Sequence, residues 1–369
     1  MKLKVGVLGL GGAGRAHAQR FLRNKSVEQV FGFDIRPVDI EKLNVCESRD
    51  EFFDSVDVVS ICTPDHEHCS DIIESLRRGK HVLVEKPMVI SSAEAERVVL
   101  EEGRHPDLVV AVHHQMRFNP AFERAKELKQ SGTLGRIFSV DAQYWHDMRI
   151  RDGQFDDWRI EHGQSLLFGA ASHPLDLVLD IVDSPLKGFQ LYSNKIGYPD
   201  SRYEYTAVQL LLQFRDGTMG SIGVNSCCRF PQNNTLRILG EDATYEDGLL
   251  YSNGRFRVLE GYFRKDEPKN MVMATRSVAF GSILKVFYKA FRKIERIFLN
   301  LLGKWELIGL RRAPLSIYNH DYASQKLVDG FLERVCTGKG RIVSVEDGRR
   351  VIVLLEEMEE RIRSAGRGG

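Results

Sequence analysis

A glycine-rich turn between two apolar segments near the N-terminus constrains the fold more than any other feature of the sequence. The apolar run 5–8 is followed by G-L-G-G-A-G at 9–14 and by a helix-like pattern through Phe21, and a second apolar run, 27–33, ends in Asp34. A G-x-G-x-x-G turn between a strand and a helix, with an acid about twenty residues later, is typical of a dinucleotide-binding βαβ unit. The sequence therefore predicts such a unit, with a pyrophosphate at the helix N-terminus.

The turn and the acid that follows it predict the cofactor. Gly9 permits the tight turn, Gly11 lets the backbone approach the pyrophosphate, and Gly14 lets helix and strand pack closely. Asp34 can bind a ribose hydroxyl and would repel a 2′-phosphate, which favours NAD, whereas Arg36 could pair with that phosphate and leaves NADP as the alternative. The predicted cofactor contacts in this region are Gly9, Gly11, Gly12, Ala13, Gly14, Asp34, Ile35 and Arg36.

Beyond this unit, apolar runs continue to alternate with helix-like segments. Strand-like runs cover 56–61, 81–84 and 108–112. Strands that alternate with helices favour a doubly wound parallel sheet, in which ligands bind outside the carboxyl ends of the strands. Thr63-Pro64 and Glu85-Lys86-Pro87 directly follow two of these runs, so we expect both segments to border the binding site.

After residue 136 the pattern changes to strand-like runs separated by tight-turn signals such as Asp216-Gly217 and Asp247-Gly248. The runs cover 137–146, 189–193, 205–214, 218–224, 235–239 and 255–259. They predict an antiparallel sheet. A length of 369 residues suits two domains. We therefore predict an N-terminal Rossmann domain over 1–120 and a second domain over 121–369.

Composition narrows the function classes. The formal net charge of +1 gives no indication of nucleic-acid binding, and no signal peptide or uncharged run of membrane-spanning length is recognised. The six cysteines lack zinc-type spacing, so we expect reduced thiols, no metal and a cytoplasmic location.

One basic segment, 276–304, has a different character. Its apolar residues from Phe280 to Leu301 recur at steps of four and three, with lysines and arginines off that stripe. Such a helix can lie on an anionic membrane surface, or it can cover a sheet or a partner subunit. The narrow apolar seam favours burial in protein.

Four short motifs follow one another along the chain: T-P-D-H-E-H at 63–68, E-K-P at 85–87, R-F-N-P at 117–120 and L-G-R-I at 134–137. Together they resemble the motifs of the Gfo/Idh/MocA family, which includes glucose–fructose oxidoreductase and inositol dehydrogenase. The resemblance implies an NAD-dependent oxidoreductase that transfers a hydride between nicotinamide and a ring hydroxyl or keto carbon of a sugar, cyclitol or sugar nucleotide. It also implies that 121–369 is a substrate-binding and dimerisation domain of the α+β class, with an open, mostly antiparallel sheet flanked by helices. A homodimer or homotetramer would form through the free face of this sheet.

The resemblance assigns roles within these motifs. Lys86 would assist proton transfer at the substrate hydroxyl, and a cis peptide before Pro87 would aim it into the cleft. Glu85 would lie near the nicotinamide ribose. The additional cofactor contacts that it implies are Cys62, Thr63, Pro64, His68, Glu85, Lys86 and Pro87.

A helix over 163–173 completes the predicted site. His173 matches the family histidine and Asp176 the acid three residues later, but the family aspartate is Gly169 here. The implied catalytic pair is Lys86 and His173. The implied substrate contacts are Lys86, Arg117, Trp158, Arg159, His173 and Asp176.

The missing aspartate leaves other functions open. The chain could bind dinucleotide and sugar as a non-catalytic regulatory protein, or an enzyme could oxidise and re-reduce its substrate on one tightly held NAD. A free sheet face would expose apolar side chains, and we expect Leu210, Leu212 and Ile222 to lie there and drive dimerisation.

Overall fold

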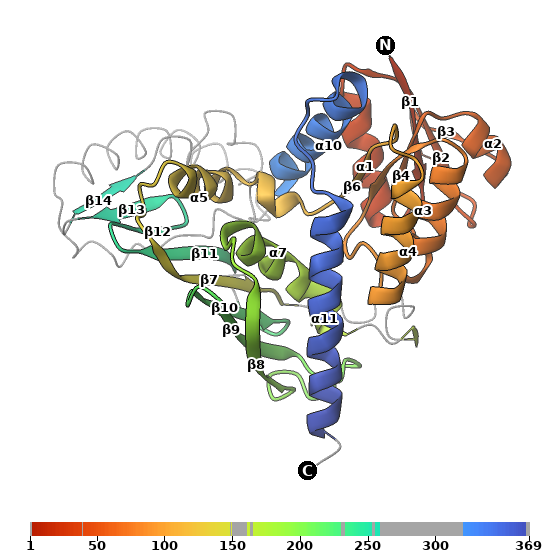
Figure 1. Ribbon diagram of the computed structural model, residues 1–369. Coiled ribbons are helices and arrows are strands. Elements are labelled where there is room, and N and C mark those ends of the chain that lie inside the picture. Colours follow the sequence, from red (N-terminus) through yellow and green to blue (C-terminus); the bar gives the residue numbers. More distant parts are fainter. Residues whose placement is uncertain are drawn as a thin grey trace, which may run out of the picture.

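The computed structural model describes residues 2–38, 40–147, 149, 161–162, 165–229, 233–252, 255–258 and 320–366. Within them the chain forms two β-sheets, and a long C-terminal helix runs past both (Figure 1). Several predicted features lie outside the described residues, namely Trp158, Arg159 and the basic helix 276–304.

The first sheet has six parallel strands in the order β3-β2-β1-β4-β5-β6. The strands are β1 (Leu3–Leu8), β2 (Val27–Phe33), β3 (Asn44–Val45), β4 (Val58–Ile61), β5 (His81–Val84) and β6 (Val110–Val112). This order is that of the dinucleotide-binding doubly wound fold. The predicted Rossmann sheet is confirmed, and β3, which is only two residues long, is an addition to it.

Helices connect these strands, and short polar side chains cap the starts of α2 and α4. They are α1 (Gly12–Arg23), α2 (Arg49–Asp54), the 3₁₀ turn η1 (Asp65–Glu67), α3 (His68–Arg77) and α4 (Ser92–Gly103). The Ser48 side chain accepts the backbone N–H of Glu51 at the start of α2, and Ser91 accepts that of Glu94 at the start of α4. All four residues of β4 are buried, as expected for a central strand covered on both faces.

A short link leads to the second sheet. After η2 (Gln115–Phe118), Asn119 caps α5 (Pro120–Gln130), and β7 (Ile137–Trp145) follows. The sheet order is β14-β13-β12-β11-β7-β10-β9-β8, and every neighbouring pair is antiparallel except β10 and β7. The remaining strands are β8 (Leu186–Asn194), β9 (Ala207–Phe214), β10 (Met219–Asn225), β11 (Asn233–Gly240), β12 (Thr244–Glu246), β13 (Leu249–Ser252) and β14 (Arg255–Val258). The predicted open, mostly antiparallel sheet is thus confirmed.

The two faces of this sheet differ, and one expectation about them is wrong. Leu210, Leu212 and Ile222 are buried on the face that α7 (Ser172–Ile181) covers, because alternate residues of a strand point to opposite faces. The opposite face carries exposed Leu211 and Met219 among glutamines and serines. The side chains that were expected to drive dimerisation therefore belong to the core.

The last two helices join the two sheets. Helix α10 (His320–Thr337) packs on α1 and η2 (Figure 1). Helix α11 (Val345–Gly366) packs on α4, in the unit built around the first sheet, and on α7 and β8, in the unit built around the second sheet (Figure 1). Buried Tyr205 donates its hydroxyl to Glu359 of α11 at 2.6 Å. Among the described residues, none of the helices combines the length and the apolar character needed to cross a bilayer.

Candidate active site

The glycine turn after β1 leaves room for a phosphate group. Gly9 has φ +87°, and a Cβ there would lie 2.7 Å from the Cys62 carbonyl oxygen, while a Cβ at Gly14 would collide with the Gly9 carbonyl. Side chains at Gly11 and Gly12 would instead meet open space. Helix α1 has no side-chain cap and no acid in its first turn, so its N-terminal N–H groups and partial positive charge face that space. These features fit a dinucleotide pyrophosphate.

Asp34 lies at the end of β2, next to the turn. Its Oδ2 accepts the backbone N–H of Leu10 at 2.7 Å, and its Oδ1 accepts that of Arg36 at 2.9 Å. These bonds fix the carboxylate at the edge of the turn. Ile35, beside Asp34, is 90% exposed, so its apolar side chain is accessible at the surface.

Lys86 stands on the loop after β5. The Lys86–Pro87 peptide is cis, as expected from the motif. The backbone N–H of Lys86 donates to Glu85 Oε2 at 3.0 Å. The Lys86 ammonium reaches the second unit, where it donates to the main-chain carbonyl of Gly169 at 2.8 Å.

The segment that receives Lys86 is not an ordinary helix. Leu167–Ala171 forms the π-helical turn η4, which leads directly into α7. Within this turn Lys86 contacts the main-chain carbonyl oxygen of Gly169, at the position where the family motif has an aspartate carboxylate. A Cβ at Gly169 would meet no heavy atom within 4 Å.

His173 lies in the first turn of α7 among other rings. Its ring stacks on that of Tyr144 at 5.6 Å between centroids and meets the His114 ring edge-on at 6.0 Å. The imidazole is 3% exposed. His173 is thus packed between the rings of Tyr144 and His114.

The loops after β4 and β5 are tied together by His68. Its Nδ1 lies 2.9 Å from the Pro87 carbonyl oxygen and its Nε2 3.0 Å from the Thr63 carbonyl oxygen. Thr63 also donates its hydroxyl to Asp71 at 2.5 Å. The structure thus gives His68 a loop-fixing role, and direct contact of His68, Thr63 or Pro64 with the cofactor stays a prediction.

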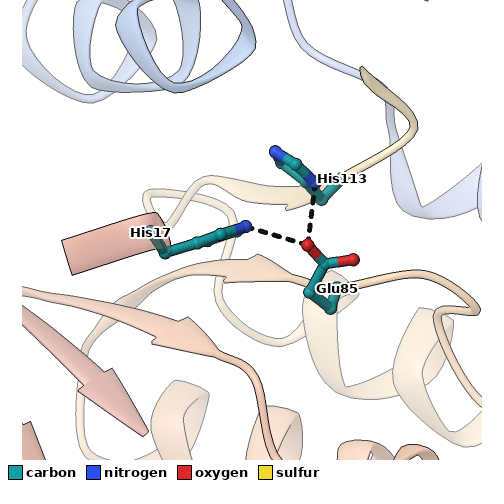
Figure 2. A group of neighbouring side chains, drawn as sticks. All are labelled: His17, Glu85 and His113. Atoms are coloured by element: carbon teal, nitrogen blue, oxygen red, sulfur yellow. Dashed lines mark hydrogen bonds and ion pairs between the residues drawn. The ribbon is translucent and has the colours of Figure 1, made fainter. Parts of the chain in front are cut away.

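The other oxygen of Glu85 lies in a buried group of imidazoles. This oxygen, Oε1, lies 2.9 Å from His17 Nε2 and 3.0 Å from His113 Nδ1, as Figure 2 shows. His17 also meets Ser60 through Nδ1, at 2.8 Å. Two imidazoles and a carboxylate are a zinc-type donor set, and their ligand atoms lie within 4.8 Å of one another. The direct contacts with one carboxylate oxygen fit a buried ion pair.

The charges in this group follow from its environment. Burial opposes protonation of His17, but the neighbouring Cys62 and Glu85 raise the pKa of this imidazole to about 10. Burial lowers the pKa of His113 to about 4. Burial would raise the pKa of Glu85, yet the two imidazoles hold it well below its ordinary value. At neutral pH the group therefore contains one imidazolium, one carboxylate and one neutral imidazole.

Arg117 lies in η2 and contacts carboxylates of both α7 and α11. Its guanidinium donates to both oxygens of Asp176, at 2.8 and 2.5 Å, and to Asp180 at 3.1 Å, and it lies 3.3 Å from Asp347 of α11. Burial would lower the pKa of Arg117, but Asp176 and the other carboxylates raise it above its usual value. The sequence predicted substrate contacts for Arg117 and Asp176. The structure pairs these two residues with each other, and a substrate contact stays a prediction.

His17, His113 and His114 were not predicted as site residues from the sequence, although His68 and His173 were. His113 and His114 directly follow β6, and His17 stands one helical turn after Gly14. Their signal was available, since the rule that selected Thr63 and Lys86, a position after a parallel strand, also selects His113 and His114.

Two family models match the chain. One, described as the oxidoreductase family with an NAD-binding Rossmann fold, matches residues 3–114, and the GFO/IDH/MocA C-terminal domain matches residues 122–246. The chain belongs to the Gfo/Idh/MocA family. This membership confirms the resemblance drawn from the four motifs.

Several curated relatives of this family member are named dehydrogenases. The 1-carboxy-3-chloro-3,4-dihydroxycyclohexa-1,5-diene dehydrogenase of Comamonas testosteroni is 24% identical over 253 residues, which are 65% of this chain and 62% of that protein. The myo-inositol 2-dehydrogenase of Thermotoga maritima is 26% identical, over 64% of this chain and 73% of that protein. The UDP-N-acetylglucosamine 3-dehydrogenase of Acidithiobacillus ferrooxidans is 32% identical, over 48% of this chain and 53% of that protein. The match thus spans about six tenths of the first of these relatives.

Solved structures share the fold over nearly the whole chain. The scyllo-inositol dehydrogenase of Lactobacillus casei with bound NAD(H) and scyllo-inositol has a TM-score of 0.74 at 17% identity, covering 98% of this chain and 96% of that one. The Acidithiobacillus ferrooxidans enzyme has a TM-score of 0.68 at 18% identity, covering 97% and 96%. At these identities the likeness establishes the two-sheet fold.

Proposed function

We propose that this family member is an NAD-dependent oxidoreductase acting on a ring hydroxyl or keto carbon of a sugar, cyclitol or sugar nucleotide. The observation that carries the proposal is Lys86, which extends from the end of a Rossmann strand to the start of α7 and is held there at 2.8 Å by the Gly169 carbonyl. An ammonium held between the two units stands where a substrate hydroxyl would meet a cofactor bound at the glycine turn. The names of the curated relatives support the substrate class.

Different residues would bind the cofactor and transfer the proton. The glycine turn and the N-terminus of α1 would hold the pyrophosphate of NAD, and Asp34 would bind the adenosine ribose. NAD supplies the chemistry of hydride acceptance when it is bound. In its neutral form the Lys86 amine would take the hydroxyl proton during oxidation, and the resulting ammonium would return it during reduction, with His173 as a second group beside the substrate.

The chain retains a partner for the lysine although the aspartate is absent. A regulatory protein that had lost its catalytic activity would have no need of a lysine directed at a polar acceptor across the two units. The contact between Lys86 and Gly169 therefore favours the enzyme over the non-catalytic alternative.

A substrate screen tests the proposal. Nicotinamide absorbance is followed with free sugars, cyclitols, uronates and nucleotide sugars, using wild type and Lys86→Met in parallel. We expect NAD reduction, or NADH oxidation with the keto compound, in wild type alone. Tight NAD binding without turnover on any member of this panel would argue for the regulatory function.

We also propose that two copies pair through the outer face of the second sheet. Leu211 and Met219 are 50% and 56% exposed on that face, between polar neighbours. Leu211→Glu should weaken association roughly tenfold, as for a typical interface side chain. Light scattering would measure this, with Ile196→Glu, at an 82% exposed residue beyond the end of β8, as the control. A 42.0 kDa mass for wild type at micromolar concentration would contradict the pairing.

A further inference from the structure

The Lys86 ammonium is bound by a neutral main-chain oxygen at the position where the family motif has an aspartate and this chain has Gly169. Lys86 Nζ lies 2.8 Å from the Gly169 carbonyl oxygen, and Lys86 is half-buried. A helical carbonyl is ordinarily occupied by an N–H four residues later. The local backbone must therefore explain how this oxygen becomes available.

Two features of the segment free carbonyl oxygens at this point. Leu167–Ala171 is π-helical, so its hydrogen bonds run to the fifth residue along the chain. Residue 174 is proline, which has no N–H. Pro174 stands four residues after Ala170 and five after Gly169, so it supplies no donor to Ala170 in an α-helical pattern or to Gly169 in a π-helical one.

We propose that the Gly169 carbonyl, exposed by the π-helical turn and by Pro174, is the positioning group for the Lys86 ammonium. This inference rests on the proposed function for its kinetic consequence, but the contact itself does not require turnover. Gly169 and Pro174 are positioning residues, since they act through Lys86.

The chemical consequence lies in the charge of the acceptor. A carboxylate next to an ammonium strongly favours the protonated amine, whereas a neutral carbonyl orients the amine with a smaller bias. A lysine held by a carbonyl therefore gives up its proton at a lower pH than one held by an aspartate. This suits a group that must accept a proton near neutral pH.

Competitive labelling of Lys86 tests the contact directly. The apoprotein is treated with a trace amine reagent across a range of pH, and mass spectrometry gives the pH at which half of the limiting Lys86 labelling rate is reached. In Pro174→Ala the new N–H competes for the carbonyl, so the midpoint should fall by about one pH unit. In Gly169→Asp, where a side chain has free space, the added carboxylate should raise the midpoint by about one pH unit.

Matched controls separate these shifts from general effects. Pro185→Ala, in the turn before β8, makes the same substitution elsewhere, and Gly188→Asp adds a carboxylate on edge strand β8, where a Cβ also meets open space. Both controls should keep the wild-type midpoint. Opposite shifts in Pro174→Ala and Gly169→Asp support the proposal, and a control-like midpoint in either folded variant overturns it.

Kinetics keep this inference distinct from the proposed function. If the enzyme turns over, the midpoint of the kcat/KM–pH profile should move in the same two directions as the labelling midpoint. If no substrate of the panel reacts, the proposed function fails while the labelling result still decides the contact. Should Pro174→Ala not fold, the Gly169→Asp midpoint alone decides: a shift upward supports the contact and no shift overturns it.

Discussion

Lys86 contacts η4, directly before α7, and Arg117 contacts α7 itself, so the two cations meet different partners. Lys86 donates to the neutral main-chain carbonyl of Gly169. Arg117 is 6% exposed and meets the carboxylates of Asp176 and Asp180. A buried cation neutralised by several carboxylates is committed to the folded structure, whereas a half-buried cation on a neutral acceptor keeps its proton available for exchange. Lys86 is the residue that we propose to be catalytic, and Arg117 is the residue that links η2 to carboxylates of α7 and α11.

The largest expected effect is on turnover. Lys86→Met should lower kcat/KM by about 10²- to 10⁴-fold, because it removes a positioned acid–base group. The melting temperature and the Kd for NAD should stay close to wild type. His173→Ala should cost less, since its ring is only a second group beside the substrate. Near-normal kcat/KM in Lys86→Met would show that Lys86 is not the acid–base group.

Arg117→Met should show the opposite behaviour, a loss of stability. Removal of one partner leaves buried Asp176 without its main counter-charge, which typically costs about 3–5 kcal/mol in the free energy of unfolding. Urea unfolding measures this. The control is Arg124→Met, whose partner Glu127 is exposed and whose loss should cost less than about 1 kcal/mol. Equal costs for the two variants would show that the junction is not held by Arg117.

The His17–Glu85–His113 group predicts a fall in stability on acidification. The folded-state pKa of His113 is about 4, below the value of 6.5 expected when unfolded, so the unfolded chain binds the extra proton first. Its contribution, roughly 3 kcal/mol at most, is complete above pH 6.5 and is lost as the pH falls towards 4.

Thermal melts across that window test the assignment. His113→Phe should flatten the dependence of melting temperature on pH between about 6.5 and 4, whereas His105→Gln, at a more exposed histidine on the first unit, should leave the slope unchanged. An unchanged slope in His113→Phe would place the acid sensitivity elsewhere. His17 has the opposite sign: its pKa is raised to about 10, so its contribution is lost as the pH rises through that value.

The smallest expected effect concerns the cofactor. Asp34→Ser should weaken NAD binding about tenfold, because a charged hydrogen-bond acceptor for the ribose is lost, and should narrow the preference over NADP. Titration calorimetry with both dinucleotides measures this. Tighter binding of NADP than of NAD by wild type would refute the preference for NAD.

The sequence predicted the first sheet closely because its signals are local. A glycine turn, a terminal acid and buried strands specify a βαβ unit residue by residue, and β1, β2 and β5 lie where they were expected. In the second sheet β12 and β13 were missed, although the turn between them was recognised. Asp247 and Gly248 have φ 45° and 91°, as a tight hairpin requires, but the flanking strands are too short to show a period-two pattern.

The site was predicted by side-chain type, which explains both its success and its gaps. Lys86 and its cis peptide follow from a motif, so they could be read from the sequence. The Gly169 carbonyl could not, since a main-chain acceptor depends on the helix type and not on the residue identity. The pairing of Arg117 with Asp347 depends on a helix more than two hundred positions later, and no local pattern carries that contact.

The central claim is that Lys86 assists direct transfer of hydrogen between a substrate carbon and the nicotinamide. The most direct measurement uses the substrate found in the screen, deuterated at the carbinol carbon, and follows deuterium in the cofactor by mass spectrometry. The account predicts that wild type places deuterium on the nicotinamide ring and that Lys86→Met does so at least about a hundredfold more slowly. Reduction without deuterium transfer, or equal rates in the two proteins, would contradict it.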